Sequence, residues 1–329
     1  MTFTLALAGD TMLGRGVAER LRQSPRAPLL DPALVEIARS ADAFVLNLEC
    51  CISDRGARIH EAGKPFFFRA PPVAAERLAE LGVTCVTLAN NHALDFGPDA
   101  LADTLAHLAA AGVASAGAGP DLGAARRAAE LSAGGRRVRV VAAADHPASY
   151  AAGGDRPGIA FADMARSGVP DWLREAAYPV GEELVLVSVH WGPNMTTAPV
   201  PHVRAAAATL ESTGATLVAG HSAHVPQGVS GRVLFDLGDF LDDYAVDPLL
   251  RNDLSMLWLI TLGVENHPRV EGVPVRLKYA YTRRADEHET RELARLLAER
   301  CAAAGSRVEV VDGRLMFSDF SRRGSFRGS

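Results

Sequence analysis

Five apolar stretches of this chain each run directly into side chains that can bind a metal ion. The stretches span residues 3–8, 43–48, 83–88, 184–189 and 217–219, and their length and composition predict buried strands. The polar residues at their ends are Asp10, Glu49, Asn91 with His92, His190 and His221. Loops at strand ends are where α/β proteins build their sites. The pattern therefore predicts an α/β sheet with a polar centre at one edge.

Each of these residues also has a purely structural interpretation. Asp10 follows Gly9 and can cap the next helix, the Asn90–Asn91 pair suits a turn, and a lone His190 suits a core. Together, however, histidine, asparagine and carboxylate ligands suit a dinuclear site of borderline metals. We therefore expect one or two divalent ions, with Mn, Fe or Zn favoured, that polarise a substrate oxygen and generate hydroxide near neutral pH.

The remaining elements fit between and after these strands. Helical patterns cover residues 16–22, 73–81, 98–111 and 205–213, and antiparallel strands are expected at 233–237, 256–262 and 275–282. Asp286 and Glu289 fit a capping box for a helix that ends at Gly305. A hairpin over 308–311 and 314–317 follows. We expect one domain over 1–317 and a flexible tail over 318–329.

Composition narrows the class of protein. With 329 residues, 48% of them hydrophobic, and a net charge of −5, the chain can bury a large core and shows no nucleic-acid footprint. The cysteines, which follow no metal-binding spacing, indicate a reduced compartment; they are Cys50, Cys51, Cys85 and Cys301. The start of the chain favours a strand over a signal peptide, and no membrane anchor is apparent. We therefore expect a cytoplasmic protein; the sequence does not indicate its oligomeric state.

Short sequence motifs contain these strand-end residues, and further motifs lie between and after them. They are GDTMLGR (9–15), NLEC (47–50), TLANNHALDFG (87–97), GAG (117–119), VHWG (189–192), GHSAHVPQG (220–228) and FDLGDF (235–240). Their order and spacing from residue 4 to about residue 245 resemble the CapA/PgsA family of poly-γ-glutamate capsule synthesis proteins. That family is similar to the calcineurin-like metallophosphatases, whose fold is a four-layer sandwich, a β-sandwich flanked by helices.

The resemblance implies roles for individual residues. The implied metal ligands are Asp10, Glu49, Asn91, His190, His221 and His224. Glu49 stands in the place of the bridging carboxylate, between a first site with Asp10 and His224 and a second with Asn91, His190 and His221. His92 would assist the leaving group, so that His92, Asp10 and Asn91 form the implied catalytic set.

Several positions depart from the patterns of these families. Met12 replaces a histidine ligand of the phosphatases, the bridging residue is Glu49 rather than an aspartate, and His221 and His224 are three residues apart instead of two. These changes predict that the first metal site is weak or open to solvent. Asp239 stands where the capsule family usually has asparagine, and Asn194 where it has glutamate. The family's founding members look membrane-anchored, so the missing anchor leaves the capsule role open.

Basic side chains near the motifs suggest an anionic substrate. Arg15 follows the first motif, and Lys64 and Arg69 lie in KPFFFR, although the chain has only two lysines. These three and Asn90 are the predicted substrate-binding residues, for a small anionic or γ-glutamyl-type substrate. The alternative is that the cations are solvated surface charges around a half-buried aromatic strand.

Three functions remain open. The first is a CapA-type hydrolase that cleaves a phosphoester or a γ-glutamyl or amide bond by a metal-bound hydroxide, with His92 protonating the leaving group. The second is a non-catalytic assembly component of poly-γ-glutamate capsule biosynthesis that binds the polymer. The third is an enzyme acting on a small γ-glutamyl or peptide metabolite.

Overall fold

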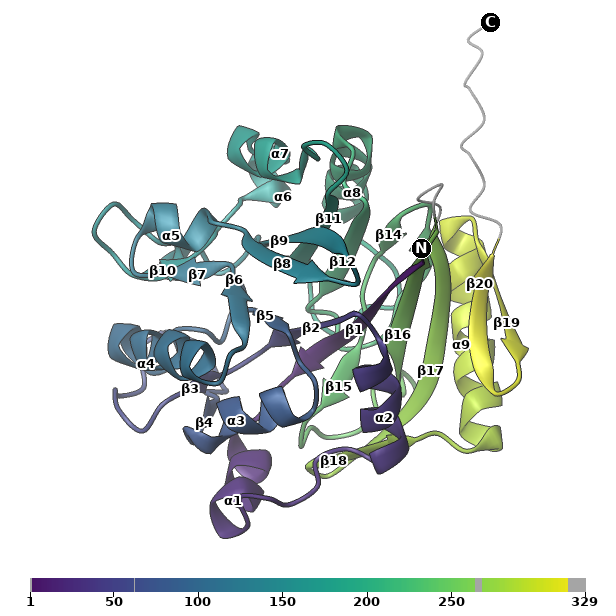
Figure 1. The fold of residues 1–329 in the computed structure, drawn as a ribbon, viewed down its shortest axis with the longest axis horizontal. Helices are drawn as coiled ribbons and strands as arrows, with labels where there is room; N and C mark the ends of the chain where they lie inside the picture. Colours follow the sequence, from purple (N-terminus) through teal and green to yellow (C-terminus); the bar gives the residue numbers. More distant parts are fainter. Residues whose placement is uncertain (1, 62, 264–267, 319–329) are drawn as a thin grey trace, which may run out of the picture.

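The structure is a computed structural model that describes residues 2–61, 63–263 and 268–318. Its larger β-sheet has β1 at its centre, between the parallel β2 and the antiparallel β16 (Figure 1). The strand order is β19 (Arg307–Val311), β20 (Arg314–Ser318), β17 (Pro268–Lys278), β16 (Leu254–Leu262), β1 (Phe3–Thr11), β2 (Ala43–Leu48), β5 (Cys85–Thr87) and β6 (Ala114–Ala116). Two further strands, β15 (Asp239–Leu241) and β18 (Tyr281–Arg284), pair with β1 and β17.

The smaller sheet is built from the middle of the chain. Its order is β13 (Val229–Ser230), β14 (Val233–Leu234), β12 (Leu217–His221), β11 (Leu184–His190), β9 (Arg136–Ala144) and β8 (Ala129–Ala133). Two-stranded sheets join β3 (Cys51–Ile52) to β4 (Arg69–Ala70) and β7 (Ala118–Gly119) to β10 (Gly158–Ile159). The centre of the smaller sheet is parallel, as its continuously buried strands predict.

The alternation along β11 shows which way its side chains face. Leu184 and Leu186 belong to the core that both sheets share, whereas Val185, Val187 and Val189 pack into a second core with the helices behind. Successive side chains of a strand point to opposite faces. His190 therefore lies on the same face as Leu184 and Leu186, directed toward the larger sheet.

Helices cover the outer faces of the two sheets (Figure 1). On the side of the larger sheet lie α1 (Arg15–Gln23), α2 (Pro32–Ser40), α3 (Val73–Glu80) and α4 (Gly97–Ala110). The smaller sheet carries α6 (Met164–Ser167), α7 (Asp171–Ala177) and α8 (Pro201–Thr213), with α5 (Leu122–Arg126) next to β7, and α9 (Glu287–Ala304) packs on β17 and β19. The predicted α/β fold, a β-sandwich flanked by helices, is confirmed.

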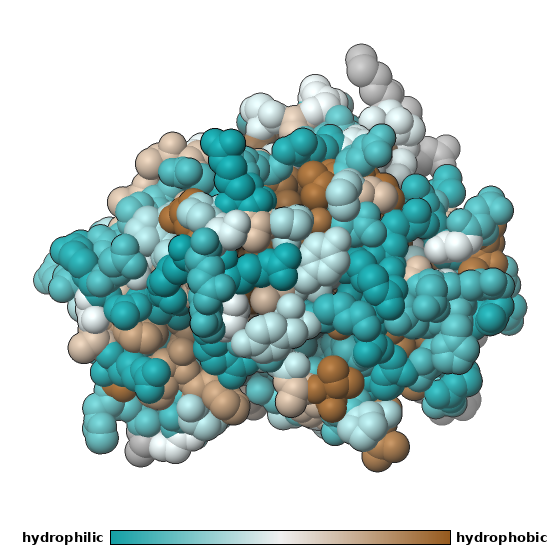
Figure 2. Space-filling view, turned by 90° about the horizontal axis from the view of Figure 1, so that it is seen from below, coloured by the Kyte–Doolittle hydropathy of each residue, from teal (hydrophilic) through white to brown (hydrophobic). Residues whose placement is uncertain are grey.

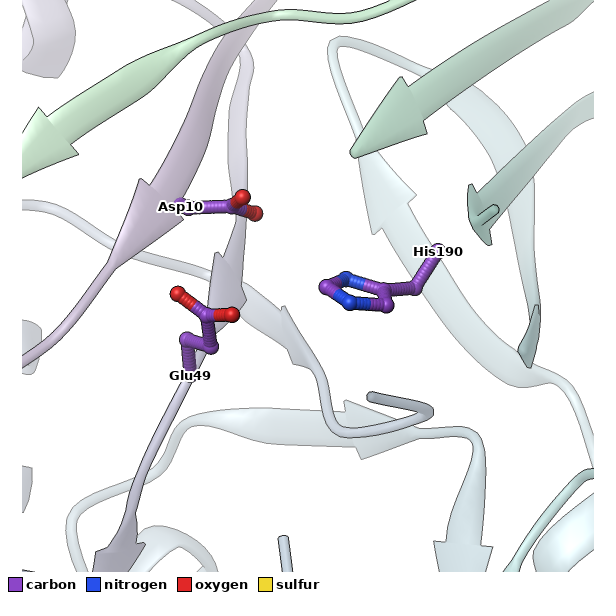
Figure 3. Close-up of side chains that lie close together, drawn as sticks. All are labelled: Asp10, Glu49 and His190. Atoms are coloured by element: carbon purple, nitrogen blue, oxygen red, sulfur yellow. The ribbon is translucent and has the colours of Figure 1, made fainter. Parts of the chain in front are cut away.

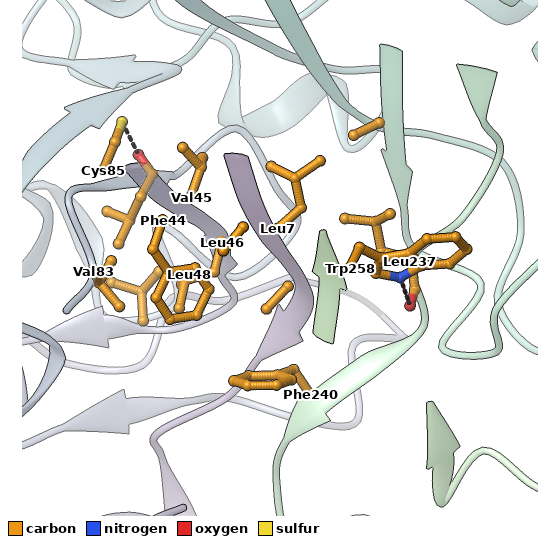
Figure 4. Packing of buried hydrophobic residues seen from close by; sticks show 14 of the residues in the cluster. Leu7, Phe44, Val45, Leu46, Leu48, Val83, Cys85, Leu237, Phe240 and Trp258 are labelled. Atoms are coloured by element: carbon orange, nitrogen blue, oxygen red, sulfur yellow. Dashed lines mark hydrogen bonds between the residues drawn. The ribbon is translucent and has the colours of Figure 1, made fainter. Parts of the chain in front are cut away.

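Large apolar side chains fill the core of the larger sheet. Phe44 and Phe240 meet edge to face with ring centroids 6.2 Å apart, and Figure 4 shows them beside Leu7 and Leu46. Trp258 is fully buried and donates its indole N–H to the Leu237 carbonyl at 3.1 Å. These contacts hold β1, β2 and the 237–240 segment together, which positions the strand ends described below.

Most predicted elements are confirmed, with two corrections. The strand predicted over 275–282 is wrong, because β17 ends at Lys278 and a turn through Ala280, at φ 54°, leads into β18. The strand predicted over 233–237 is only the two-residue β14. The capping box of α9 and the hairpin of β19 and β20 are present. Ser318 still belongs to β20, while 319–329 lies outside the described residues, so the domain boundary stays a prediction.

None of the helices in the described part of the chain is both long enough and apolar enough to cross a bilayer. The face shown in Figure 2 is mostly hydrophilic, with small and separate apolar areas.

Candidate metal centre

Strand ends from both sheets meet in one buried cluster. Asp10 lies near the end of β1 and Glu49 directly follows β2, while His190 and His221 are the last residues of the parallel neighbours β11 and β12. All four are at most 3% exposed. Figure 3 shows the Asp10 and Glu49 carboxylates pointing toward the His190 ring, which comes from the opposite sheet. The predicted convergence of the strand ends is therefore what the fold produces.

Two groups of side chains have the spacing of metal ligands. Asp10, Glu49 and His190 each offer an atom within 4.8 Å of the others, and so do Asp10, His224 and Asp239. Carboxylate oxygens and imidazole nitrogens in this mixture suit Mn, Fe or Zn. Asp10 is common to both groups, whereas the resemblance implied Glu49 as the shared carboxylate.

Several buried donor atoms around this cluster have no hydrogen-bond partner. They are Glu49 Oε1, Asn91 Oδ1, both ring nitrogens of His190, His221 Nδ1 and Asp239 Oδ2. Leaving one polar atom buried and unpaired costs about 1–3 kcal/mol, and such atoms are rare in native structures. Six of them in one cluster fit a cation that would satisfy them together.

Asp10 is held ionised at the middle of the cluster. Its Oδ1 accepts a hydrogen bond from Asn47 Nδ2 at 2.7 Å, and its Oδ2 accepts one from the Ser222 N–H at 3.2 Å. Burial opposes the charge, but the His221 ring, whose Nδ1 lies 3.5 Å from Oδ1, and the charge of His224 hold the pKa of Asp10 below its ordinary value. Asp10 is therefore ready to bind a cation as a carboxylate.

The net pKa shift of Glu49 is in the opposite direction. Its Oε2 accepts a hydrogen bond from the Tyr244 hydroxyl at 3.1 Å. Burial and the neighbouring Asp10 charge raise the pKa of Glu49 to about 8. Burial also lowers the pKa of His190 well below its usual range, which keeps the ring in the neutral form that metals bind.

The loop after β12 has a strained backbone that places His224. Ser222 and His224 both have positive φ, at 106° and 60°, which is uncommon for residues with a side chain. His224 Nδ1 lies 2.7 Å from Asp239 Oδ1 and 3.3 Å from Asp10 Oδ2. Burial opposes protonation of this ring, but the Asp239 and Glu49 charges raise its pKa well above the usual range. Strain of this kind collects at functional sites.

His92 forms a separate pair with a carboxylate. Its Nδ1 lies 2.7 Å from Asp95 Oδ2. Asp95 is fully buried, and it also accepts hydrogen bonds from the Phe68 N–H at 2.6 Å and the Tyr150 hydroxyl at 3.1 Å. Lys64 Nζ is 3.0 Å from Asp95 Oδ1. Asp95 therefore fixes the orientation of the His92 ring and leaves Nε2 available.

The predicted substrate-binding residues have different surroundings. Arg15 pairs with Asp243 and lies over the rings of Phe66, Phe68 and Tyr244, with 34% of its side chain exposed. Lys64 is engaged by Asp95 and by the Asn91 carbonyl.

The other two predicted substrate-binding residues, Arg69 and Asn90, form hydrogen bonds within the fold. Arg69 donates to the carbonyls of Arg55 and Gly56 and packs on Phe96. Asn90 is fully buried, and its amide donates to Asn47 Oδ1 and the Leu48 carbonyl. Arg15 alone of the four combines exposure with a place beside the cluster, and the substrate-binding roles of all four stay predictions.

Two residues of the cluster were not identified from the sequence. Asp239 was noted only as a replacement for asparagine, yet its carboxylate completes the group with Asp10 and His224. Asp95 stands three residues after His92 in the ALDFG motif, and this spacing was the available signal.

Met12, at the position of a phosphatase ligand, is fully buried. Its sulfur accepts a hydrogen bond from the Gly14 N–H at 3.0 Å, so this side chain stabilises the backbone of the loop.

Comparison with known proteins places this geometry in a family. Residues 4–244 match the sequence profile described as "Bacterial capsule synthesis protein PGA_cap". The chain belongs to this family. A "Probable polyglutamine synthesis accessory protein" of Mycobacterium tuberculosis is 33% identical to it, over 93% of each chain. The "PGA biosynthesis protein CapA" of Bacillus subtilis is 27% identical over 72% of this chain and 63% of its own length.

A solved structure is also similar to this PGA_cap family member. It is described as a hypothetical protein from Thermus thermophilus, with a TM-score of 0.47 and 16% identity over 83% of this chain and 98% of the other. The resemblance seen in the motifs is thus confirmed by the family profile and the mycobacterial relative.

Proposed function

We propose that this PGA_cap family member is a metal-dependent hydrolase that cleaves a phosphoester or a γ-glutamyl or amide bond in an anionic substrate. The observation that supports this most is the convergence of unpartnered, buried donor atoms from two sheets on Asp10. The printed names of its relatives refer to PGA or polyglutamine synthesis and to a capsule. We therefore propose poly-γ-glutamate capsule biosynthesis as the pathway.

The residues that would hold the metal are those of the two ligand groups, together with Asn91 and His221, which have unpaired buried atoms. They are Asp10, Glu49, Asn91, His190, His221, His224 and Asp239. A divalent cation of the Mn, Fe or Zn class would supply Lewis acidity toward a substrate oxygen and lower the pKa of a water molecule. The unpaired Oδ1 of Asn91 supports its inclusion, because an amide oxygen binds such cations without adding charge.

His92 is proposed as the proton donor to the leaving group. Asp95 accepts from its Nδ1, so the proton to be transferred would be on Nε2. Burial lowers the pKa of His92, and the Asp95 carboxylate acts against this effect. Lys64 offsets the charge of Asp95 through its contact at 3.0 Å. The role proposed for Lys64 thus changes from substrate binding to support of the His92–Asp95 pair.

Arg15 is proposed as the residue that meets the anionic part of the substrate. Its guanidinium lies 5.0 Å from the Phe68 ring centroid, and Phe68 packs against the His92 ring at 4.2 Å. Phe68 therefore contacts both the Arg15 guanidinium and the ring of the proposed proton donor, His92. A guanidinium suits carboxylate and phosphate groups equally. A cytoplasmic location and the lack of a nucleic-acid partner stay predictions.

The alternative is a component that binds the polymer without cleaving it. Met12 favours this function, because its sulfur is used by the Gly14 N–H where the phosphatases have a ligand. A site with fewer metal ligands can bind an anionic polymer and still lack turnover.

Metal content tests the proposal first. We expect purified protein, prepared without chelator, to hold one to two equivalents of a transition metal, and His190→Ala to lose most of it. His288 is exposed at the start of α9, so His288→Ala is a matched control that should keep the metal. The loaded protein would then be assayed on phosphoesters and γ-glutamyl amides. Wild-type protein that takes up no metal, even on incubation, would exclude the hydrolase.

A further inference from the structure

A second cavity lies beyond the metal centre, between the segment after β15 and the end of β17. Its volume is about 240 Å³, and its lining includes Asp242, Tyr244, Asp253, Arg276 and Lys278. Drug-sized ligands occupy pockets of roughly 300–1,000 Å³. This cavity therefore suits a smaller molecule, and its lining carries charges of both signs.

The negative side of the cavity contains an unpaired carboxylate oxygen. Asp242 is 5% exposed, its Oδ1 accepts the Tyr244 N–H at 2.9 Å, and its Oδ2 is buried without a partner. Burial raises the pKa of Asp242 to about 6, so the group is mostly ionised at neutral pH. An ionised and buried oxygen without a donor favours a ligand that brings an N–H group.

The positive side is formed by two residues near the end of β17. Arg276 pairs with Asp253 through Nη1, and its buried Nε lies 3.9 Å from Glu289 Oε1, so its charge is already met by two carboxylates. Lys278 is exposed and has no ion-pair partner in the described ranges, although it is one of only two lysines in the chain. Asp253 also binds Arg251 at 2.9 Å, so its charge is already offset. Lys278 therefore favours an anionic group on the ligand.

We propose that this cavity binds a small zwitterion, a molecule with one ammonium group and one carboxylate. The ammonium would donate to Asp242, and the carboxylate would accept from Lys278. The unpaired Asp242 oxygen and the Lys278 ammonium would then each gain a partner, which a purely cationic or purely anionic ligand cannot provide.

The cavity adjoins the metal centre through a single side chain. Tyr244 lines the cavity, and its hydroxyl donates to Glu49 Oε2 at 3.1 Å. A ligand in the cavity would therefore contact the residue that holds Glu49. The proposal goes beyond the hydrolase function and does not depend on it, because ligand binding can be measured without metal and without turnover.

Three molecules with the same five-carbon chain separate the contributions of the two charges. They are L-norvaline, valerate, which lacks the ammonium, and 1-aminopentane, which lacks the carboxylate. Titration of the full-length protein in chelator, followed by calorimetry or ligand-observed NMR, should show norvaline binding at least about tenfold more tightly than either analogue, as one charged hydrogen bond provides. Equal binding of all three, or no binding of norvaline at millimolar concentration, would overturn the proposal.

Two variants test which residue binds each charged group of the ligand. Asp242→Asn should remove the preference for norvaline over valerate, and Lys278→Met should reduce the preference over 1-aminopentane. Arg295 is an exposed cation of α9 away from this lining, so Arg295→Met should change neither preference. Lys278 is exposed, so its variant should fold even if the Asp242 variant does not. Unchanged preferences in a folded Lys278→Met protein would contradict the assignment.

Discussion

Asp10 and Glu49 are two buried carboxylates whose ligand atoms lie within 4.8 Å of those of His190. Their protonation differs because their partners differ. Asp10 accepts two hydrogen bonds and faces His221 and His224, whereas Glu49 accepts one from Tyr244 and faces the Asp10 charge. When no cation is bound, Asp10 therefore carries the negative charge and Glu49 carries the proton near neutral pH.

Metal affinity should rise with pH because Glu49 must lose its proton to bind. Burial and the Asp10 charge place the pKa of Glu49 at about 8, so a cation competes with a proton below that pH. Calorimetric titration with Mn²⁺ should show tighter binding at about pH 8 than at about pH 6, with a proton released per ion. Glu49→Gln should bind more weakly and show a smaller pH dependence. A pH-independent affinity in wild-type protein would contradict this assignment.

His92→Ala should separate chemistry from metal binding. The ring touches Asp95, Phe68 and, through Asp95, Lys64, but its nitrogens are not in either ligand group. We expect unchanged metal content and a turnover reduced by roughly two to four orders of magnitude, the scale of a lost general acid. Asp95→Asn should retain part of the activity, because the ring remains while its orientation weakens. Equal activity of His92→Ala and wild type on every substrate would remove His92 from the mechanism.

The apolar runs indicated the site residues that end strands, and the motifs added Asn91, His92 and His224, but Asp239 was not predicted as a ligand. Asp10, Glu49, His190 and His221 were found because an apolar run precedes each one. Asp239 lies at the start of the short β15, in a segment that pairs with β1 only through the fold, so no local pattern marked it. Likewise, no local sequence pattern around Lys64 indicated that its side chain would pair with Asp95.

At the scale of elements, the β11–β12 pair aligns the two histidines from the smaller sheet. The parallel register places His190 opposite His221. Gly220 precedes His221 and allows β12 to pass the Phe235 carbonyl, because a Cβ there would lie 1.9 Å from that oxygen. The site thus depends on a glycine that contributes no ligand.

Gly220→Ala should destabilise the fold and disturb the site together. The added methyl group would also lie 2.4 Å from Trp191 Nε1, which donates to the Phe235 carbonyl. We expect a loss of about 2–3 kcal/mol in the free energy of unfolding, the scale of an overpacked core, measured by urea denaturation. Gly154→Ala is the control, since nothing lies within 4 Å of its Cβ position. Equal stability of the two variants would show that the contact relaxes at little cost.

Elements whose ends are marked by local sequence signals were predicted well, whereas elements whose ends depend on tertiary contacts were not. β2 matches its predicted bounds, and α9 has the capping box that Asp286 and Glu289 indicate. The helix α2 was missed although Asp31 at its N-cap and Pro32 at its first position are helix-start signals. The β17–β18 turn was missed because Ala280 takes up a positive φ that alanine rarely adopts, with its N–H donated to the Asp242 carbonyl at 2.9 Å.

At the scale of the molecule, the site joins two sheets that share one core. Asp10 and Glu49 belong to the larger sheet and His190 and His221 to the smaller. A cation bound by all of them would resist separation of the sheets and would not bind the unfolded chain in the same way.

Removal of metal should therefore lower the melting temperature. A free metal concentration of about 100 times the Kd stabilises the folded state by about 2.7 kcal/mol, which corresponds to a shift of roughly 4 °C for a chain of this size. Calorimetric scans with and without chelator would measure it. The His190→Ala protein should show no shift, and a full shift in that variant would mean that the cation binds elsewhere.

The position of β1 has a consequence for how the protein is made. β1 leaves the ribosome before β16, yet one of its two long edges pairs with β16, whose last residue is Leu262. A nascent chain therefore carries a buried-type strand with an open edge until Leu262 has been synthesised. His190, His221 and Asp239 also emerge long after Asp10. The metal centre is thus expected to form only after Asp239 has left the ribosome, so metal loading cannot precede the synthesis of that segment.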